Sequence, residues 1–312
     1  MSWLHLVVLG AAGGLAAMTA AVADPSATSP SNDRRSASLE RMQSSIEAGD
    51  VDEAIRQGQL AGPVIVERAL ASRSRATRLA AIAAAPGVEG RSELLVGLAH
   101  AAAGPDRRIA IPAATSARAI ARELQRAAER DELSDDHAAA DLVTWRDAWA
   151  ERALDRERWI ELRVLALDVT AALELAIARA RAREGERAEP GIGVSLEAAL
   201  ADPDPAFRRA AVEVVPVPTP HGLRATLAAA VVRDTDPRVA LAAAQALCAD
   251  LVADPAAPIL DALGEPGLQR IRTLVTLDDA PVAVVRDAAR CLRADPSPAS
   301  RAALRAIAGR VR

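Results

Sequence analysis

The sequence predicts an all-α protein, and its composition gives the first two observations that support this fold class. Of the 312 residues, 51% are hydrophobic but only 2% are aromatic. The apolar residues are dominated by Ala and Leu, the strongest helix formers, whereas strands favour β-branched and aromatic residues. The third observation is a helical repeat, described below. A chain of this length is long for one compact core, which favours two domains or one elongated array.

The expected helices follow one another from Leu39 to the C-terminus. Asp50 and Glu53 have the spacing of a capping box at a helix start, and Ser134 is the expected cap of a later helix. The repeat register between residues 90 and 190 is left open by the sequence. The elements that we expect are an opening helix from Leu39, a first repeat that begins after Asp50 and ends with 75–85, a second over 92–128 with its turn near Pro105 and Asp106, a longer pair over 134–183, a loop over 185–194, repeats at 195–215, 221–249 and 256–293, and a closing helix from Ser297.

Short turns rich in Asp and Pro recur in the second half of the chain. Residues 202–205 read Asp-Pro-Asp-Pro, residues 234–237 read Asp-Thr-Asp-Pro, and residues 278–281 form a looser copy, Asp-Asp-Ala-Pro. Asp accepts hydrogen bonds from the free amides of a helix start, and Pro suits the first helical position. Each copy leads into an Ala-rich stretch, whose small side chains let a neighbouring helix lie close. The intervals between copies lie within or near the range of two-helix repeats.

This pattern resembles the HEAT-repeat family, in particular its bacterial HEAT-like members, in which an Asp-Pro-x-x-Arg turn opens the second helix. The resemblance implies an α-solenoid of stacked helical hairpins over 39–312, with an Asp–Arg ladder between repeats and the second helices along the concave surface. By position, Asp204 and Arg208 match that pair, Asp236 matches the Asp alone, and Arg286 matches the Arg. The motif says almost nothing about activity.

The N-terminus resembles an export signal. Residues 1–23 carry no formally charged side chain and end in Ala21-Val22-Ala23, the small-residue pattern of a signal-peptidase site. The region before the apolar run lacks Arg and Lys, and an uncleaved membrane anchor is the alternative. Residues 24–38 are polar and rich in Ser and Pro, which predicts a disordered linker. We therefore expect an exported chain, periplasmic or secreted, with no membrane insertion after cleavage.

The chain has two cysteines, Cys248 and Cys291. An even number of cysteines in an exported protein permits a disulfide. However, Cys248 follows the repeat's anchor residue Leu247 whereas Cys291 precedes its counterpart Leu292, and these offsets place the two thiols on different helix faces. The pattern favours two separate buried cysteines, and the pairing stays open.

No motif in the sequence indicates catalysis. The balance of 38 basic and 42 acidic residues lacks the basic stripe of a nucleic-acid-binding protein. His100, His137 and His221 lie far apart, and the Asp-x-Asp pairs are better explained as helix caps than as metal ligands. The isolated Gly191-Ile192-Gly193 lacks the context that dinucleotide binding requires. We expect no catalytic residue, cofactor, metal or nucleic-acid partner.

Two groups of residues are candidates for binding a protein partner. Trp145 and Trp149 share a helix face, with Trp159 nearby, and they either pack in the core or form an aromatic binding site. The second group is a row of arginines on the expected inner helices: Arg209, Arg238, Arg286 and Arg290. We expect a monomeric, non-catalytic scaffold that binds protein through the concave surface. An accessory structural subunit of a cell-envelope complex is the alternative, and an unrecognised enzyme is a more remote one.

Overall fold

The computed structural model describes residues 30–133, 138–185, 193–217, 219–253 and 258–309. Within these ranges the chain forms fifteen α-helices, two short 3-10 helices and no strand, which confirms the all-α prediction. In the same ranges no helix has the length and apolar character needed to cross a bilayer. The predicted signal peptide over residues 1–23 lies outside the described residues.

The helices differ widely in length, from eight residues to twenty-four. Their bounds are α1 Pro30–Glu47, α2 Val51–Ala61, α3 Pro63–Leu70, α4 Arg75–Ala84, α5 Leu94–Ala103, α6 Arg107–Glu129, α7 Ala139–Leu154, α8 Ile160–Arg183, α9 Gly193–Leu200, α10 Pro205–Glu213, α11 His221–Arg233, α12 Pro237–Ala253, α13 Ile259–Leu274, α14 Val282–Ala294 and α15 Pro298–Ile307, with 3-10 turns η1 at Ala85–Gly87 and η2 at Arg91–Glu93.

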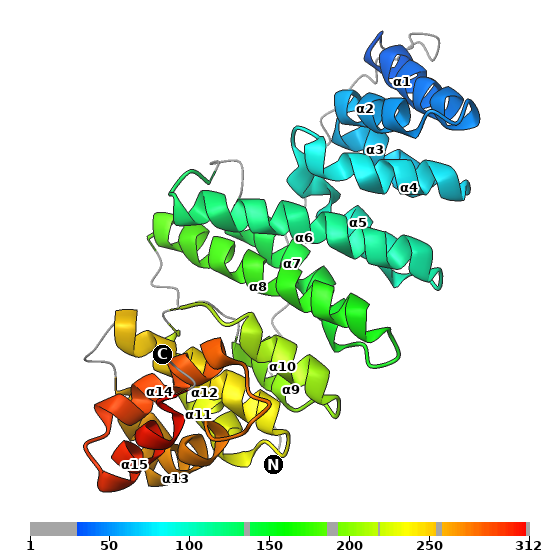
Figure 1. The fold of residues 1–312 in the computed structure, drawn as a ribbon. Helices are drawn as coiled ribbons and strands as arrows, with labels where there is room; N and C mark the ends of the chain where they lie inside the picture. Colours follow the sequence, from blue (N-terminus) through cyan, green and yellow to red (C-terminus); the bar gives the residue numbers. More distant parts are fainter. Residues whose placement is uncertain (1–29, 134–137, 186–192, 218, 254–257, 310–312) are drawn as a thin grey trace, which may run out of the picture.

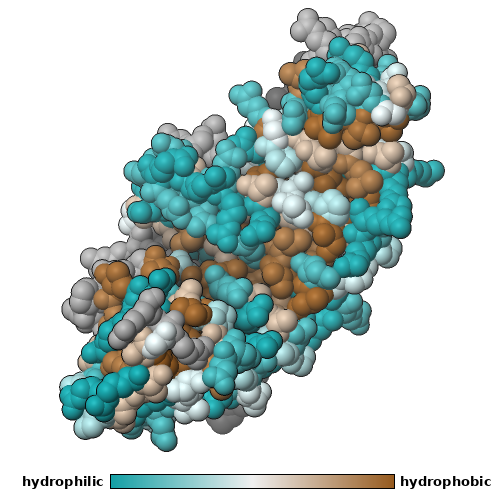
Figure 2. Space-filling view, viewed as in Figure 1, coloured by the Kyte–Doolittle hydropathy of each residue, from teal (hydrophilic) through white to brown (hydrophobic). Residues whose placement is uncertain are grey.

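The helices are arranged in two layers that run the length of the molecule (Figure 1). Each odd-numbered helix from α1 to α13 packs against the even-numbered helix that follows it. In addition, each odd-numbered helix contacts the next odd-numbered one, and the even-numbered helices contact one another in the same way from α2 to α14. The chain therefore progresses from α1 at one end to α15 at the other. Hydrophobic surface is visible along the middle of the face drawn in Figure 2, between charged and polar side chains.

Side-chain caps start several helices, as the sequence predicts. The Asp50 carboxylate accepts from the Glu53 amide at 3.0 Å, and the Ser297 hydroxyl accepts from the Ser300 amide at 3.2 Å. The reciprocal half of the capping box is absent, because the Glu53 carboxylate instead accepts from Gln57 at 2.5 Å. The capping residue, not the full box, sets this helix start.

Three boundaries differ from the predicted ones. Helix α1 begins at Pro30 instead of Leu39, so the second part of the predicted linker (24–38) is helical. Gly62 has a φ of 83° and is followed by Pro63, and this break divides the helix expected after Asp50 into α2 and α3. Ser134 lies outside the described residues, and α7 begins at Ala139 without a side-chain cap.

Cys248 on α12 and Cys291 on α14 form a disulfide, so the expectation of two separate thiols is wrong. Their Cα atoms lie 5.3 Å apart and both residues are fully buried. Neighbouring helices in one layer meet through opposite flanks. Cys248 comes one position after the inward-facing Leu247, and Cys291 comes one position before the inward-facing Leu292. The two cysteines therefore lie on the flanks that face each other. The offsets that suggested separation are the geometry of contact between adjacent helices of a layer.

Removal of this disulfide is expected to destabilise the carboxyl-terminal helices. The bond closes a loop with a sequence separation of 43, for which restriction of the unfolded chain predicts a loss of about 4 kcal/mol. Urea unfolding of the double variant Cys248→Ala/Cys291→Ala, followed by circular dichroism, measures this loss. The reduced wild-type protein is the matched control and should unfold at a similar urea concentration, whereas an unchanged midpoint in both would contradict the prediction.

Candidate functional site

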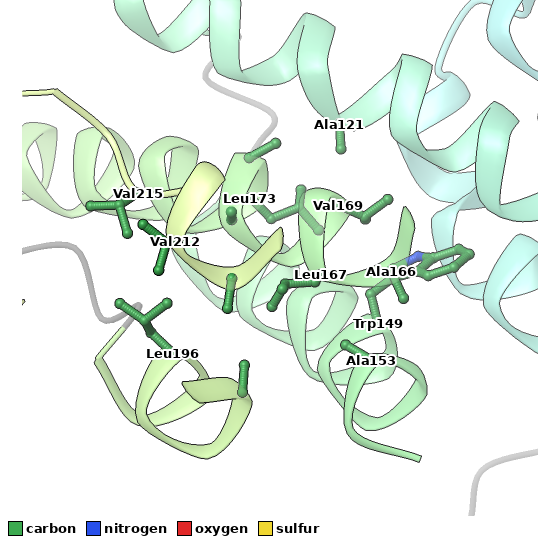
Figure 3. Close-up of a cluster of buried hydrophobic side chains, with 14 of the residues drawn as sticks. Ala121, Trp149, Ala153, Ala166, Leu167, Val169, Leu173, Leu196, Val212 and Val215 are labelled. Carbon is green, nitrogen blue, oxygen red and sulfur yellow. The ribbon is translucent and has the colours of Figure 1, made fainter. Parts of the chain in front are cut away.

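Trp149 belongs to the protein core, which is the first of the two alternatives that the sequence leaves open for this residue. Its side chain is 0% exposed, and its indole Nε1 donates to the Leu95 carbonyl at 3.1 Å. Figure 3 shows the ring beside Ala153 and Ala166 in the buried cluster. The bond to Leu95 joins α7 to α5, so this residue fixes two successive odd-numbered helices.

Trp145 and Trp159 are half-buried and pack against the same core. Because Trp145 shares its helix face with Trp149, that face is turned toward the interior. Trp159 occupies the N-cap position of α8. For these two residues a role in partner binding remains a prediction.

Arg209 and Arg238 come together at one groove on the even-numbered layer. The groove has a volume of about 270 Å³ and lies between α10, α12 and the start of α14. Its lining residues are Arg209, Glu213, Pro237, Arg238, Leu241, Ala242, Gln245, Leu277, Asp279, Ala280, Pro281 and Val284. Two of the four predicted arginines therefore belong to one surface feature, which we call the α10–α12 groove.

The charges around the α10–α12 groove are paired with one another. Arg209 lies 3.2 Å from Glu213 on the same helix, and Arg238 lies 3.3 Å from Asp279. All four side chains are well exposed, so each pair contributes at most about 1 kcal/mol. The groove thus combines an apolar floor with a rim that offers both donors and acceptors. The Arg209–Glu213 spacing is visible in the sequence, but the contact with Asp279 requires the packing of α12 beside the turn before α14.

Arg286 and Arg290 lie away from this groove. Arg290 pairs with Asp287 at 3.0 Å and borders a separate shallow hollow with Leu251 and Val252. Arg286 is exposed on α14 and lines neither surface. The predicted arginine row is therefore divided between different places on the layer.

Arginine–aspartate pairs connect successive helical pairs, but through a different Asp from the expected one. Arg163 of α8 donates to Asp202 at 2.5 Å, and Arg208 of α10 donates to both carboxylate oxygens of Asp234 at 2.8 and 2.9 Å. We call these two contacts the rungs. Among the described residues Arg286 has no ion pair with the turn after α14, whose Asp295 pairs with Arg272 at 2.8 Å.

The two Asp residues of each turn have separate roles. The first, Asp202 or Asp234, accepts the arginine and also an amide of its own turn. The second, Asp204 or Asp236, caps the helix by accepting from its first amides. The match of Asp204 with Arg208 was therefore wrong: Arg208 reaches forward to the next turn. The helix-cap explanation of the second Asp is confirmed.

The rungs hold their carboxylates in the ionised form. Burial acts to raise the pKa of Asp202, but hydrogen bonds from Arg163 and the Asp204 amide lower it, and the net shift is downward. Burial likewise acts to raise the pKa of Asp234, but hydrogen bonds from Arg208 and the Asp236 amide lower it, and the net shift is again downward. These lowered pKa values fit stable ion pairs and do not indicate a proton-transfer group.

The described part of the chain contains no group of three or more His, Cys, Asp or Glu side chains placed to hold a metal ion. The acidic pairs at the repeated turns are occupied by helix amides and arginines, as described above. The groove between α10 and α12 is therefore the surface that best combines predicted residues with a defined shape. Comparison with protein-family models and with curated proteins found no match to this chain.

Proposed function

We propose that this chain is an exported, non-catalytic interaction scaffold, a HEAT-like α-solenoid that binds a segment of a partner protein in the α10–α12 groove. The observation that carries the proposal is the groove itself, which brings Arg209 and Arg238 to the rim of an apolar floor. Solenoid proteins bind partners along extended surfaces built from successive repeats. The two layers of helices support this architecture, because each helical pair contacts mainly its neighbours.

The disulfide supports export. Disulfides persist in oxidising compartments and are rare in the cytosol, where thiols are kept reduced. The bond between Cys248 and Cys291 is fully buried between two helices, which is the setting of a structural bond. Together with the apolar N-terminal segment, this favours a periplasmic or secreted protein.

The chemistry of the groove favours a polypeptide as its occupant. Leu241, Leu277 and Val284 offer an apolar floor that accommodates an aliphatic or aromatic side chain. The rim carries one acid and one base on each side, through the Arg209–Glu213 and Arg238–Asp279 pairs. A peptide backbone presents both donors and acceptors at every residue and therefore matches a rim of mixed sign. A polyanion would meet as many acids as arginines there.

Site-specific photocrosslinking tests this proposal. A photoreactive phenylalanine analogue in place of Gln245, inside the groove, should yield one discrete crosslinked product in the intact cell envelope. The same analogue in place of Ala229, which lines a hollow beside the odd-numbered helix α11, should yield none. The additional substitution Ala242→Arg fills the groove and should displace the partner's side chain from the apolar floor. The amount of product crosslinked at position 245 should therefore fall at least about tenfold.

The outcomes separate the proposal from its alternatives. Equal crosslinking at both positions, or a product insensitive to Ala242→Arg, would overturn the groove as the partner site. A complex that purifies in fixed stoichiometry from the envelope would instead favour an accessory structural subunit. Ala229→Arg serves as the control for a bulky charge elsewhere on the array.

A further inference from the structure

Another hollow, larger than the α10–α12 groove, lies where α6 and α8 meet the start of α11. Its volume is about 590 Å³, within the range of small-molecule binding sites. Its walls come from α6, α8, the end of α10, the segment that follows α10, and the first turn of α11. None of the residues predicted to bind a partner lies in it.

Unequal helix lengths create this hollow. Helix α8 has 24 residues and α10, the next helix of the layer, has nine. At a rise of 1.5 Å per residue they span about 36 and 14 Å. Helix α8 therefore extends beyond α10, and the backbone over 214–217 passes beside this overhang instead of covering it.

Cationic side chains from three helices line the hollow. Arg122 of α6 is held by Asp168 and Gln125. Arg224 of α11 lies 3.7 Å from the buried carboxylate of Asp250. Arg179 of α8 is exposed, and among the described residues it makes no hydrogen bond or ion pair.

The acids on the same wall already have partners. Glu129 accepts from Gln125 at 2.7 Å, and Glu213 pairs with Arg209 at 3.2 Å. Arg122 and Arg118 share the single carboxylate of Asp168. The Arg179 guanidinium, with all of its donors unused, is therefore available to an anion.

Two further donors border the hollow. Thr219 is 2% exposed, yet within the described chain its Oγ1 has no hydrogen-bond partner. It precedes Pro220, the N-cap of α11, which provides no side-chain cap for the first amides of the helix. A helix start with free amides favours a bound anion. Thr219, the first residues of α11 and Arg179 line one hollow, and the Thr219 amide donates to the buried Asp250 carboxylate at 2.8 Å.

The remaining wall is apolar and suits an organic group. It is formed by Ala128, Ala171, Leu175, Val214, Val215, Pro216 and Val217. The donors come from three separate elements, which matches the several acceptor oxygens of a phosphate better than a planar carboxylate. We propose that the hollow binds a phosphate monoester, with its phosphate between Arg179, Thr219 and the start of α11, and its organic part on the apolar wall.

Isothermal titration of the purified mature chain with phenyl phosphate, at neutral pH and low salt in a phosphate-free buffer, tests the site. We expect saturable binding, at least about tenfold weaker binding of benzoate, and weaker binding of inorganic phosphate. Arg179→Ala should reduce the affinity for phenyl phosphate about tenfold, and Thr219→Val about threefold, because each removes a hydrogen bond to the anion. Neither variant breaks a bond present in the structure, so both should melt like the wild type.

Arg233→Ala is the matched control, since it removes an exposed arginine from the opposite end of α11. It should change the affinity by less than about twofold, as distant surface charges are screened. Absence of saturable binding, or an equal effect of Arg179→Ala and Arg233→Ala, would overturn the site. Equal affinities for inorganic and phenyl phosphate would overturn the assignment of the apolar wall. These results do not depend on the α10–α12 groove, which the crosslinking experiment tests separately.

Discussion

Trp149→Ala is expected to lower the free energy of unfolding by about 4 kcal/mol. The substitution leaves a cavity in a site that is 0% exposed and removes the indole donor to the Leu95 carbonyl. Large-to-small changes of buried aromatic residues cost about 3–5 kcal/mol, through lost burial and the cavity that remains. The loss should appear as a lower urea midpoint when the ellipticity at 222 nm is followed.

Two variants separate the causes of this loss. Trp149→Phe keeps much of the volume but leaves the Leu95 carbonyl without its donor, so it should cost about 1–3 kcal/mol. Trp145→Ala removes a half-buried ring from the same helix and should cost less than Trp149→Ala. If Trp149→Ala retained wild-type stability and lost only partner crosslinking, its assignment to the core would be contradicted.

Asp202→Asn is expected to cost about 3 kcal/mol. The carboxylate is the partner of Arg163, and the two side chains are 3% and 5% exposed. Removing one charge of a buried pair leaves the other uncompensated, at a cost of about 3–5 kcal/mol. The Arg163 guanidinium also stacks 4.0 Å from the centroid of Phe207, so its displacement disturbs the packing of α10. Urea unfolding of the two proteins at neutral pH measures the difference.

Asp204→Asn is the matched control, two residues away in the same turn. Asp204 caps α10 by accepting from the Ala206 amide, and Asn caps helices about as well as Asp. Its cost should therefore be close to zero, and similar costs for both variants would contradict the division of roles. The pKa of Asp202 is lower in the folded chain than in the unfolded one, so its contribution is complete above about pH 4. The difference between wild type and Asp202→Asn should shrink as the pH falls below that value.

Local features of the fold could be predicted from the sequence. The caps at Asp50, Asp204, Asp236 and Ser297 lie where the sequence predicts helix starts, because a cap depends on residues within one turn. The all-helical class follows from a composition rich in Ala and Leu. These features need no knowledge of which helix packs beside which.

Features that depend on contacts between helices were missed or misassigned. The disulfide and the forward contact of Arg208 with Asp234 each depend on which flank of a helix meets its neighbour. A helical pattern defines faces but not the partner that covers them. The hollow beside Arg179 depends on the short length of α10 relative to α8, and α8 lies in the region where the sequence leaves the repeat register open.

The bond between α12 and α14 also determines what a single peptide cleavage does to this chain. A peptidase that cuts anywhere between residues 248 and 291 opens the backbone, yet the two fragments remain covalently joined through the cystine. Helix α13 lies within that interval, so the last hairpins keep their neighbours after such a cut. This crosslink therefore keeps the carboxyl-terminal end of the array attached after such a cut.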